Sequence, residues 1–402
     1  MSTNDAVRRA VGEALDLLNR GRATDALALL DVAEGEHPRA VDIKLQKAAA
    51  LRVLGDLTGA LGALDAALAM DPYHFVALLS KGAVLERMHR VRAAAAAYGA
   101  ALRIAPRPEH TPPALQAPIR RARELIVFQA QALAEHLRER TREVRGRHAS
   151  APLARFDECL DVLAGTKRVH HAAPVQLHVP RLPAIPFFER AEFPWLARLE
   201  AAADVIRLEL QVLIDAGMPD FAPYIDYPPG APVNQWGELN RSRAWSSYWL
   251  WRDGRSQPQA MARCPRTTEV LAELPLADQP GFAPTALFSA LAPRTRIPPH
   301  TGSTNARLIV HLPLLLPGPA RFRVGNETRD WRMGEAWVFD DTIEHEAWNE
   351  AVETRVLLIF DIWNPLLSNA ERELISAMML ARSAWYAEES PVTAAAVDRM
   401  PP

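Results

Sequence analysis

Proline recurs at intervals of 34 residues in the first 110 residues of this chain, as Pro38, Pro72 and Pro106. Small and apolar residues recur in the same register, in columns formed by Ala26, Ala60 and Ala94, by Ala33, Ala67 and Ala101, by Leu30, Leu64 and Tyr98, and by Leu17, Leu51 and Leu85. Small side chains let two antiparallel helices approach closely, and a proline ends the second helix because it cannot continue it. The spacing therefore predicts a stack of helical hairpins over residues 1–110.

The pattern resembles the tetratricopeptide repeat, a helix–turn–helix unit with a period of 34 residues. Gly21 and Gly55 mark the turn inside the first two units, where the third unit has His89. The glycine typical of the first helix is present only as Gly82, with alanine in the other two units. An alanine-rich bundle with accidental spacing is the alternative, and five coincident columns favour the repeat.

The middle of the chain, residues 111–183, is predicted as a helix and a proline-rich linker. The helix spans about residues 118–145, with arginine and glutamate alternating along it, which is typical of a solvated face. An amphipathic helix follows at about residues 194–216, with an apolar side that includes Leu196, Leu199, Val205, Leu208 and Val212.

The third predicted domain, residues 184–402, is rich in short apolar segments that glycine, proline and asparagine separate. Candidate strands span residues 307–312, 320–324, 336–339 and 355–363, before a closing helix at about residues 369–386. Strands of this length and punctuation are typical of a sandwich or a jelly-roll barrel. The predicted fold class is thus α plus β: an all-α repeat solenoid, then a double-stranded β-helix (jelly-roll) domain with flanking helices.

Composition excludes several classes of protein. The net charge of −2 predicts no nucleic-acid partner. The sequence contains no run of about 18 uncharged apolar residues, so no transmembrane segment is predicted. Two cysteines, Cys159 and Cys264, do not imply a disulfide framework. Because residues 1–22 also lack the apolar core of a signal peptide, we expect a cytoplasmic location. Hydrolase motifs such as G-x-S-x-G and H-E-x-x-H do not occur.

Two histidines in turn-rich segments beside predicted strands are the candidate metal ligands. His300 lies in the segment 299–305, and His345 follows Phe339-Asp340-Asp341. Imidazole binds Fe(II), Zn, Cu and Ni well, and the usual non-haem iron site adds a carboxylate. The place for that carboxylate, two residues after the first histidine, is occupied by Gly302. Asp340 or Asp341 is the nearest substitute.

The segment from about residue 184 to 367 resembles the aspartyl/asparaginyl β-hydroxylase family of Fe(II)- and 2-oxoglutarate-dependent oxygenases. The resemblance rests on His300-Thr301-Gly302, Thr304-Asn305-Ala306-Arg307-Leu308, His311-Leu312, Asn326-Glu327-Thr328 with Trp331, the run from Phe339 to Trp348, Arg355 and Asp361-Ile362-Trp363. It implies a site of two histidines and no carboxylate, with His300 and His345 holding iron and with 2-oxoglutarate and O2 as cosubstrates. Animal members of the family also carry tetratricopeptide repeats ahead of the oxygenase domain.

A dicarboxylate cosubstrate needs a cation at its distal end, and Arg355 at the start of an apolar strand is the candidate. By resemblance, Ser289 would assist it and His311 would lie near the other carboxylate. A family arginine two residues before His311 is replaced by Ile309, so Arg307 is a further candidate. Alternatives remain open at this point. Arg355 could form a buried ion pair with Asp340 or Asp361, His311 could be a core histidine, and Ser289 could be an ordinary small residue.

Four tryptophans, Trp236, Trp245, Trp249 and Trp251, cluster within sixteen residues. Aromatic residues at this density usually form core, so we interpret most of them as core and some as candidates for a substrate groove.

The resemblance implies hydroxylation of the β-carbon of Asp or Asn in a peptide or protein. The repeats agree with a peptide or protein partner, because concave solenoid surfaces bind extended chains. One alternative is an oxygenase acting on a free amino acid, a natural product or a lipid headgroup. The other is a catalytically inactive interaction protein that uses its repeats.

Overall fold

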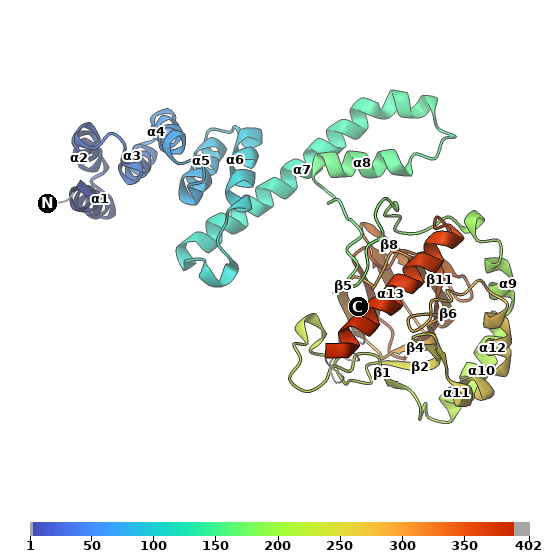
Figure 1. Ribbon diagram of the computed structural model, residues 1–402. Coiled ribbons are helices and arrows are strands. Elements are labelled where there is room, and N and C mark those ends of the chain that lie inside the picture. Colours follow the sequence, from blue (N-terminus) through green and yellow to red (C-terminus); the bar gives the residue numbers. More distant parts are fainter. Residues whose placement is uncertain (1–2, 390–402) are drawn as a thin grey trace. The chain divides into compact units, whose positions relative to one another are not determined.

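The computed structural model describes residues 3–389 and divides the chain into two compact units. The first unit ends at Arg168 and is helical (Figure 1). The second begins at Val169 and contains every strand among the described residues. The predicted linker, residues 111–183, is divided between the two units.

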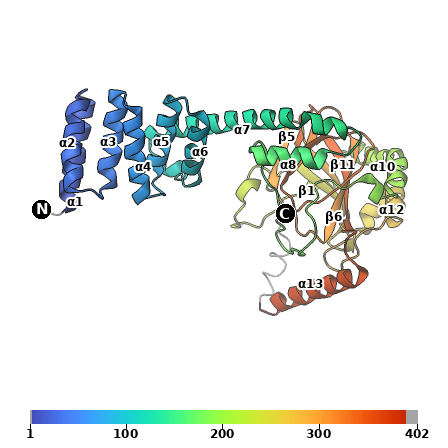
Figure 2. The same cartoon turned by 90° about the horizontal axis from the view of Figure 1, so that it is seen from above.

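The first unit begins with helices α1 (Thr3–Asn19), α2 (Ala23–Glu36), α3 (Val41–Leu54), α4 (Leu57–Met70), α5 (Phe75–Arg87) and α6 (Val91–Arg103). They stack as successive hairpins, as Figure 2 shows, and this confirms the predicted helical repeats. The alanines of the repeating columns lie where helices cross; Ala26, Ala60 and Ala94 are fully buried. At Gly82 a Cβ would lie 2.3 Å from the Tyr98 ring, so only glycine lets α5 and α6 pack this closely.

The turn inside each hairpin needs a left-handed residue. Gly21 and Gly55 have φ values of 74° and 85°, and His89 adopts 58° at the same place in the third hairpin. Glycine adopts this conformation at no steric cost, whereas histidine does so against its preference.

An ion pair also recurs with the repeat period. Lys47 Nζ lies 2.7 Å from Asp31, and Lys81 Nζ lies 2.6 Å from Asp65, one repeat later. After the repeats, α7 (Pro113–Arg147) packs on α6, and α8 (Ala154–Ala164) packs on α7. Helix α7 contains the helix predicted at residues 118–145.

The second unit consists of two antiparallel sheets that share an interior. The larger has the order β1 (Ala222–Pro223), β2 (Trp245–Arg252), β4 (Ala286–Leu291), β11 (Arg355–Trp363), β6 (Arg307–Leu315) and β9 (Trp337–Phe339), with β3 (Arg255–Ser256) paired to β2. The smaller has the order β5 (Thr295–His300), β10 (His345–Asn349), β7 (Ala320–Val324) and β8 (Glu327–Asp330). The predicted α-plus-β class is confirmed, and the name double-stranded β-helix for this topology stays a prediction.

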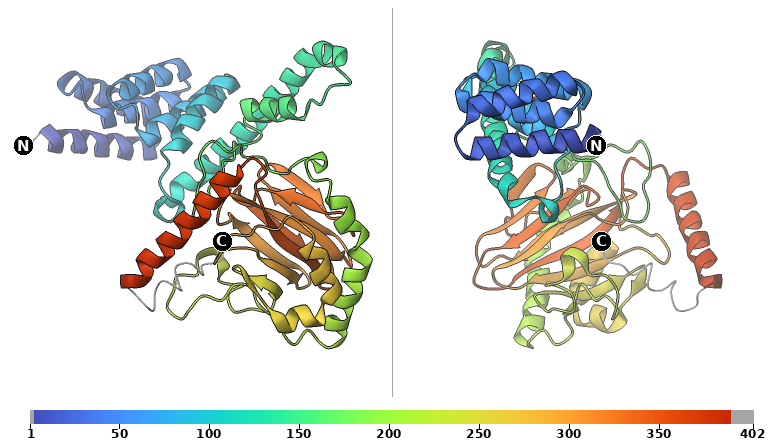
Figure 3. Two further views of the ribbon diagram at one scale, coloured as in Figure 1. Left: turned by 45° about the vertical axis from the view of Figure 1, so that its right-hand side comes forward. Right: turned by 90° about the vertical axis from the view of Figure 1, so that its left-hand side faces the viewer.

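The larger sheet has two differently packed faces because side chains alternate along each strand. Leu308, Val310 and Leu312 of β6 belong to the outer core, which helices α9 (Leu196–Ala201), α10 (Ala203–Asp215), α11 (Pro258–Arg263) and α12 (Pro265–Ala272) complete (Figures 1 and 2). Ile309 and His311 therefore point to the inner face, toward the smaller sheet. Helix α13 (Asn369–Glu389) lies outside the strands in Figure 3 and buries Ile375 and Met379.

The helix predicted at residues 194–216 is divided into α9 and α10 at Ala202. Ile206 and Leu210 are buried, whereas Leu208 and Val212 are about two-thirds exposed, at 68% and 66%. The predicted apolar side is therefore wrong for Leu208 and Val212, whereas Val205 packs against the outer core. The buried residues continue from Leu199 at helical spacing, and Leu208 and Val212 lie off that face.

Candidate metal and dicarboxylate site

The two candidate histidines lie side by side at the ends of neighbouring strands. His300 is the last residue of β5, His345 is the first residue of β10, and their Cα atoms are partners in the antiparallel ladder. Their ring centroids are 4.0 Å apart, and both residues are buried. Strand pairing therefore converts a separation of 45 residues in sequence into direct proximity.

Backbone carbonyl groups orient both imidazole rings in the same way. His300 Nδ1 lies 2.7 Å from the Pro298 carbonyl oxygen, and His345 Nδ1 lies 3.1 Å from the Ile343 carbonyl oxygen. A nitrogen that donates to a carbonyl carries the proton, which leaves the lone pair on Nε2 of each ring. Burial lowers the pKa of His300 to about 4, and burial together with His300 lowers that of His345 well below its usual value. Both rings are therefore neutral at pH 7 and able to bind a metal.

The space beside Gly302 is filled by the Asp341 carboxyl group. A Cβ at position 302 would lie 1.9 Å from Asp341 Oδ2, and Gly302 N donates to the Asp341 carbonyl oxygen over 2.7 Å. No group of three histidine, cysteine or acidic side chains among residues 3–389 is arranged to hold a metal ion. Burial raises the pKa of Asp341 to about 8, while Asp340 accepts hydrogen bonds from Thr342 in the turn before His345.

Arg355 is buried on the inner face without a carboxylate partner. It is 1% exposed, its Cζ lies 4.8 Å from the centroid of the Trp331 ring, and its Nε and Nη1 atoms have no hydrogen-bond partner in the described chain. Burial lowers its pKa to about 9. Neither carboxylate of the alternative ion pair is bonded to Arg355, because Asp361 pairs with Arg307 and Asp340 accepts from Thr342.

His311 and Ser289 lie on the same inner face as Arg355. The His311 ring is 4.7 Å from that of Phe339, its Nδ1 has no partner in the described residues, and burial followed by the charge of Arg355 lowers its pKa well below the usual value. Ser289 Oγ accepts a hydrogen bond of 3.1 Å from Trp245 Nε1.

Arg307 is engaged with other partners through its Nη1 atom, while its buried Nε atom has no hydrogen-bond partner among the described residues. Its Nη1 atom donates to Asp361 over 2.5 Å and to the Phe282 carbonyl oxygen over 3.0 Å. The prediction that Arg307 contacts the cosubstrate stays a prediction, and the structure gives its guanidinium a different partner. Ile309 contributes only an apolar side chain to this face.

Two polar residues, Ser247 and Trp331, were not identified as site residues from the sequence, where Trp331 was named only as part of the family motif. Ser247 Oγ and Trp331 Nε1 are buried without a partner in the described residues, and both belong to the inner face. Trp245 and Trp236, interpreted mainly as core, have ring centroids 6.3 Å and 4.9 Å from that of His300. Buried donors without acceptors are rare in folded proteins, so their concentration near Arg355 indicates a ligand rich in acceptors.

The residues present therefore suit a dicarboxylate beside a metal. Arg355 offers two buried donors, and Ser247, Trp331 and His311 offer further polar atoms without partners. Carboxylate oxygens are the acceptors that match such a set.

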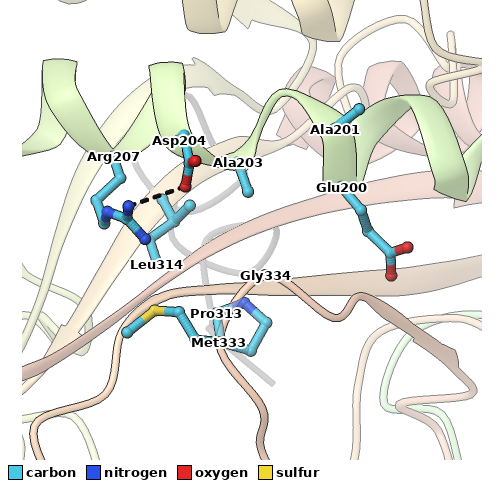
Figure 4. A pocket seen from close by; sticks show the side chains of 9 residues that line it. All are labelled: Glu200, Ala201, Ala203, Asp204, Arg207, Pro313, Leu314, Met333 and Gly334. Atoms are coloured by element: carbon cyan, nitrogen blue, oxygen red, sulfur yellow. Dashed lines mark hydrogen bonds and ion pairs between the residues drawn. The ribbon is translucent and has the colours of Figure 1, made fainter.

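A surface pocket of about 370 Å³ lies elsewhere, on the outer face of the larger sheet (Figure 4). It is lined by Pro313 and Leu314 of β6 and by residues of α9 and α10. Its charged side chains are already paired, as the Asp204–Arg207 contact in Figure 4 shows. Because the two histidines lie on the inner face, this pocket is separate from them.

The fold and the paired imidazoles define a protein with a helical repeat unit and a two-sheet unit built around a buried bis-histidine site. The sequence profile of the family described as aspartyl/asparaginyl beta-hydroxylase matches residues 200–365. A human protein named aspartyl/asparaginyl beta-hydroxylase is 36% identical over 142 residues, which cover 35% of this chain and 18% of that protein. The ornithine lipid ester-linked acyl 2-hydroxylase of Rhizobium tropici is 32% identical over 204 residues, covering 50% of this chain and 68% of that protein.

This chain belongs to the aspartyl/asparaginyl beta-hydroxylase family. It spans about a fifth of the length of the human and mouse relatives that carry the family name. Solved structures similar to the helical unit include the first tetratricopeptide domain of Spaghetti (RPAP3) bound to an HSP90 peptide, at 16% identity and a TM-score of 0.28, covering 33% of this chain and 99% of that one. The Sgt2 tetratricopeptide domain of Aspergillus fumigatus is 18% identical with a TM-score of 0.27, covering 30% and 78%. Among the described residues, no helix combines the length and apolar character that crossing a membrane requires.

Proposed function

We propose that this protein is an Fe(II)- and 2-oxoglutarate-dependent dioxygenase that hydroxylates an unactivated carbon. The observation that carries the proposal is the pairing, in register, of two neutral imidazoles on a face that also holds a buried arginine without a carboxylate partner. Family membership supports a hydroxylase.

His300 and His345 would hold the iron through their Nε2 atoms, because their Nδ1 atoms are engaged by backbone carbonyl groups. Gly302 adds no ligand, and the Asp341 carboxyl group beside it prevents any side chain from taking that place. Iron, 2-oxoglutarate and O2 together supply the oxidising power that replaces hydrogen by hydroxyl, with succinate and CO2 as co-products.

The residues around the metal would bind and orient the cosubstrate. Arg355 would bind the distal carboxylate, since a guanidinium grips a carboxylate through two parallel hydrogen bonds. Ser289 would add its hydroxyl group, and His311 would lie near the other carboxylate. The aromatic rings of Trp331 and Phe339 exclude water and so strengthen these contacts.

The acceptor that the family name suggests is the β-carbon of Asp or Asn in a peptide or protein. Helical repeats support this candidate because such arrays present extended surfaces to partner chains. The repeat unit would then recruit the protein substrate to the oxygenase unit.

A free amino acid, a natural product or a lipid is the second candidate acceptor. One observation favours an acceptor without a carboxylate, such as a lipid. Of the two inner-face arginines of β6 and β11, Arg307 is paired with Asp361, and Arg355 is the one proposed for the cosubstrate. The charge of Arg307 is therefore already balanced by a carboxylate, and a substrate carboxylate would compete with Asp361 for it. The Rhizobium tropici relative, whose name describes an acyl 2-hydroxylase, agrees with this alternative.

Anaerobic titration of the purified full chain with Fe(II) and 2-oxoglutarate tests the proposal. We expect a weak visible charge-transfer band that needs both components, disappears in His345→Ala and persists in His148→Ala, an exposed histidine beyond α7. A folded protein with no band would refute the oxygenase and favour an inactive, repeat-based interaction protein. Succinate release stimulated by Asp- or Asn-containing peptides, compared with acyl lipids and free amino acids, then separates the acceptors.

A further inference from the structure

Residues 173–179 form an extended segment, here called the strap, that lies against the loop that follows His300 and the loop that precedes His345. Val175 N donates to the Gly302 carbonyl oxygen over 3.0 Å, and Gln176 N and Leu177 N donate to the Ser303 carbonyl oxygen over 3.0 Å and 3.1 Å. At its other end, Ala173 N donates to the Thr342 carbonyl oxygen over 2.8 Å. A single segment thus contacts the loop after His300 and the loop before His345.

Asn305 anchors the strap from within the first loop. Its side-chain oxygen accepts from Val179 N over 2.7 Å, and its side-chain nitrogen donates to the Val179 carbonyl oxygen over 2.9 Å. Asn305 is 1% exposed, so both bonds are shielded from water. Leu177 and Val179 also pack against the apolar cluster that contains Ala306.

The bonded carbonyl groups are close in sequence to the groups that orient the imidazoles. Gly302 and Ser303 follow His300 by two and three residues. Thr342 directly precedes Ile343, whose carbonyl oxygen accepts from His345 Nδ1. Moving the strap would therefore shift the backbone that determines where both Nε2 atoms point.

We propose that the strap, anchored by Asn305, positions the two histidines for metal binding. The inference rests on the proposed function, because it concerns the same two ligands. Asn305 is a positioning residue that touches neither metal nor cosubstrate and acts through the loop after His300. The strap precedes the family-matched segment, residues 200–365, and lies in the stretch that composition alone predicts as linker.

An ordinary linker would explain the extended backbone but not the direction of its donors. Every strap hydrogen bond described above is made with the loop after His300 or the loop before His345. A segment that served only to connect two units would not require hydrogen bonds to these two loops. The strap also begins within a few residues of the division between the two units, at Arg168 and Val169.

The test is calorimetric titration of the full chain with Zn(II) alone, comparing wild type with Asn305→Ala. We expect the variant to bind Zn(II) at least about tenfold more weakly, as is usual when a group that orients a ligand is removed. Asn349→Ala is the matched control. Asn349 is equally buried and clamps three carbonyl groups at the far end of β10, away from the strap.

A second pair of variants keeps the test valid if Asn305→Ala does not fold. Val175→Pro removes the N–H that bonds to Gly302, directly after a proline already present at position 174, and Val175→Ala keeps that N–H. The proline variant should bind Zn(II) more weakly than the alanine variant.

Zn(II) affinities in Asn305→Ala and Val175→Pro that equal those of their controls, with wild type binding normally, would overturn the inference alone. Failure of wild type to bind Zn(II) or Fe(II) at all would overturn the proposed function as well. Unfolding in urea, followed by tryptophan fluorescence, separates loss of metal affinity from loss of stability.

Discussion

Replacing Arg355 by methionine should make the metal-free sheet unit more stable while it abolishes binding of 2-oxoglutarate. The reason is that Arg355 is buried, charged and without a carboxylate partner until a ligand supplies one. Methionine has a similar length, fills irregular space and keeps an apolar contact with Trp331. Ligand binding and stability therefore change in opposite directions.

The magnitude follows from the acidity of the guanidinium. Burial lowers the pKa of Arg355 from 12.5 to about 9. Since a tenfold change in an acidity constant corresponds to about 1.4 kcal/mol, the buried charge costs the metal-free protein on the order of 5 kcal/mol. Loss of the cation–π contact and of some side-chain volume offsets about 1–3 kcal/mol of this. We expect Arg355→Met to raise the free energy of unfolding by about 2–4 kcal/mol.

Arg307→Met is the matched control, and we expect it to change the free energy of unfolding in the opposite direction. Arg307, whose side chain is 12% exposed, also lies on the inner face, but it is paired with Asp361. Its removal leaves the Asp361 carboxylate buried without a cation, which should lower the free energy of unfolding by about 3–5 kcal/mol.

Tryptophan fluorescence in urea is the appropriate assay because all ten tryptophans lie in the sheet unit, from Trp195 onward. With Zn(II) bound, added 2-oxoglutarate should stabilise wild type in proportion to the logarithm of its concentration and leave Arg355→Met unchanged. A destabilised Arg355→Met protein, or one that 2-oxoglutarate still stabilises, would refute the reasoning.

Three further predictions concern single contacts. Gly302→Ala should destabilise the metal-free sheet unit by about 1–3 kcal/mol because its Cβ would lie 1.9 Å from Asp341 Oδ2. Strict additivity of the Gly302→Ala and Asp341→Ala effects in a double-mutant cycle would contradict that contact. The metal-free sheet unit should lose stability as the pH falls from about 6.5 toward 4, because the pKa of His300 is about 4 in the folded protein and about 6.5 in the unfolded chain. If His300→Gln showed the same dependence of stability on pH as wild type, the assignment to His300 would be refuted. Gly82→Ala should lower the midpoint of thermal helix loss measured by circular dichroism, because its Cβ would enter the ring of the next helix, whereas Gly62→Ala has open space and should not lower it.

Local packing rules made the repeat unit predictable. Small residues such as Ala60 and Ala94 must recur wherever helices cross at a fixed period, so the sequence alone locates the hairpins. The break at Ala202 was not predictable in the same way. No proline or glycine marks it.

The site was predictable as a set of residues but not as a set of partners. His300 and His345 follow from their motifs, whereas their pairing in register is a property of the folded sheet. Asp361 was an open candidate partner for Arg355, and the fold pairs it with Arg307 from the adjacent strand β6. Ser247 was missed, and Trp331 was named only as part of the family motif, because a donor without an acceptor can be recognised only after the chain is folded.

The position of the two histidines at the facing ends of β5 and β10 has a mechanical consequence. An ion held by both rings would cross-link residues 300 and 345 and close a loop of 45 residues, as a disulfide does, but reversibly. The hydrogen-bonded ladder between these strands is irregular immediately beside His345, so a metal cross-link there would stabilise the part of the ladder that is least regular. Metal binding would then raise the free energy of unfolding of this end of the sheet. A chelator would lower that stability as well as stop the chemistry.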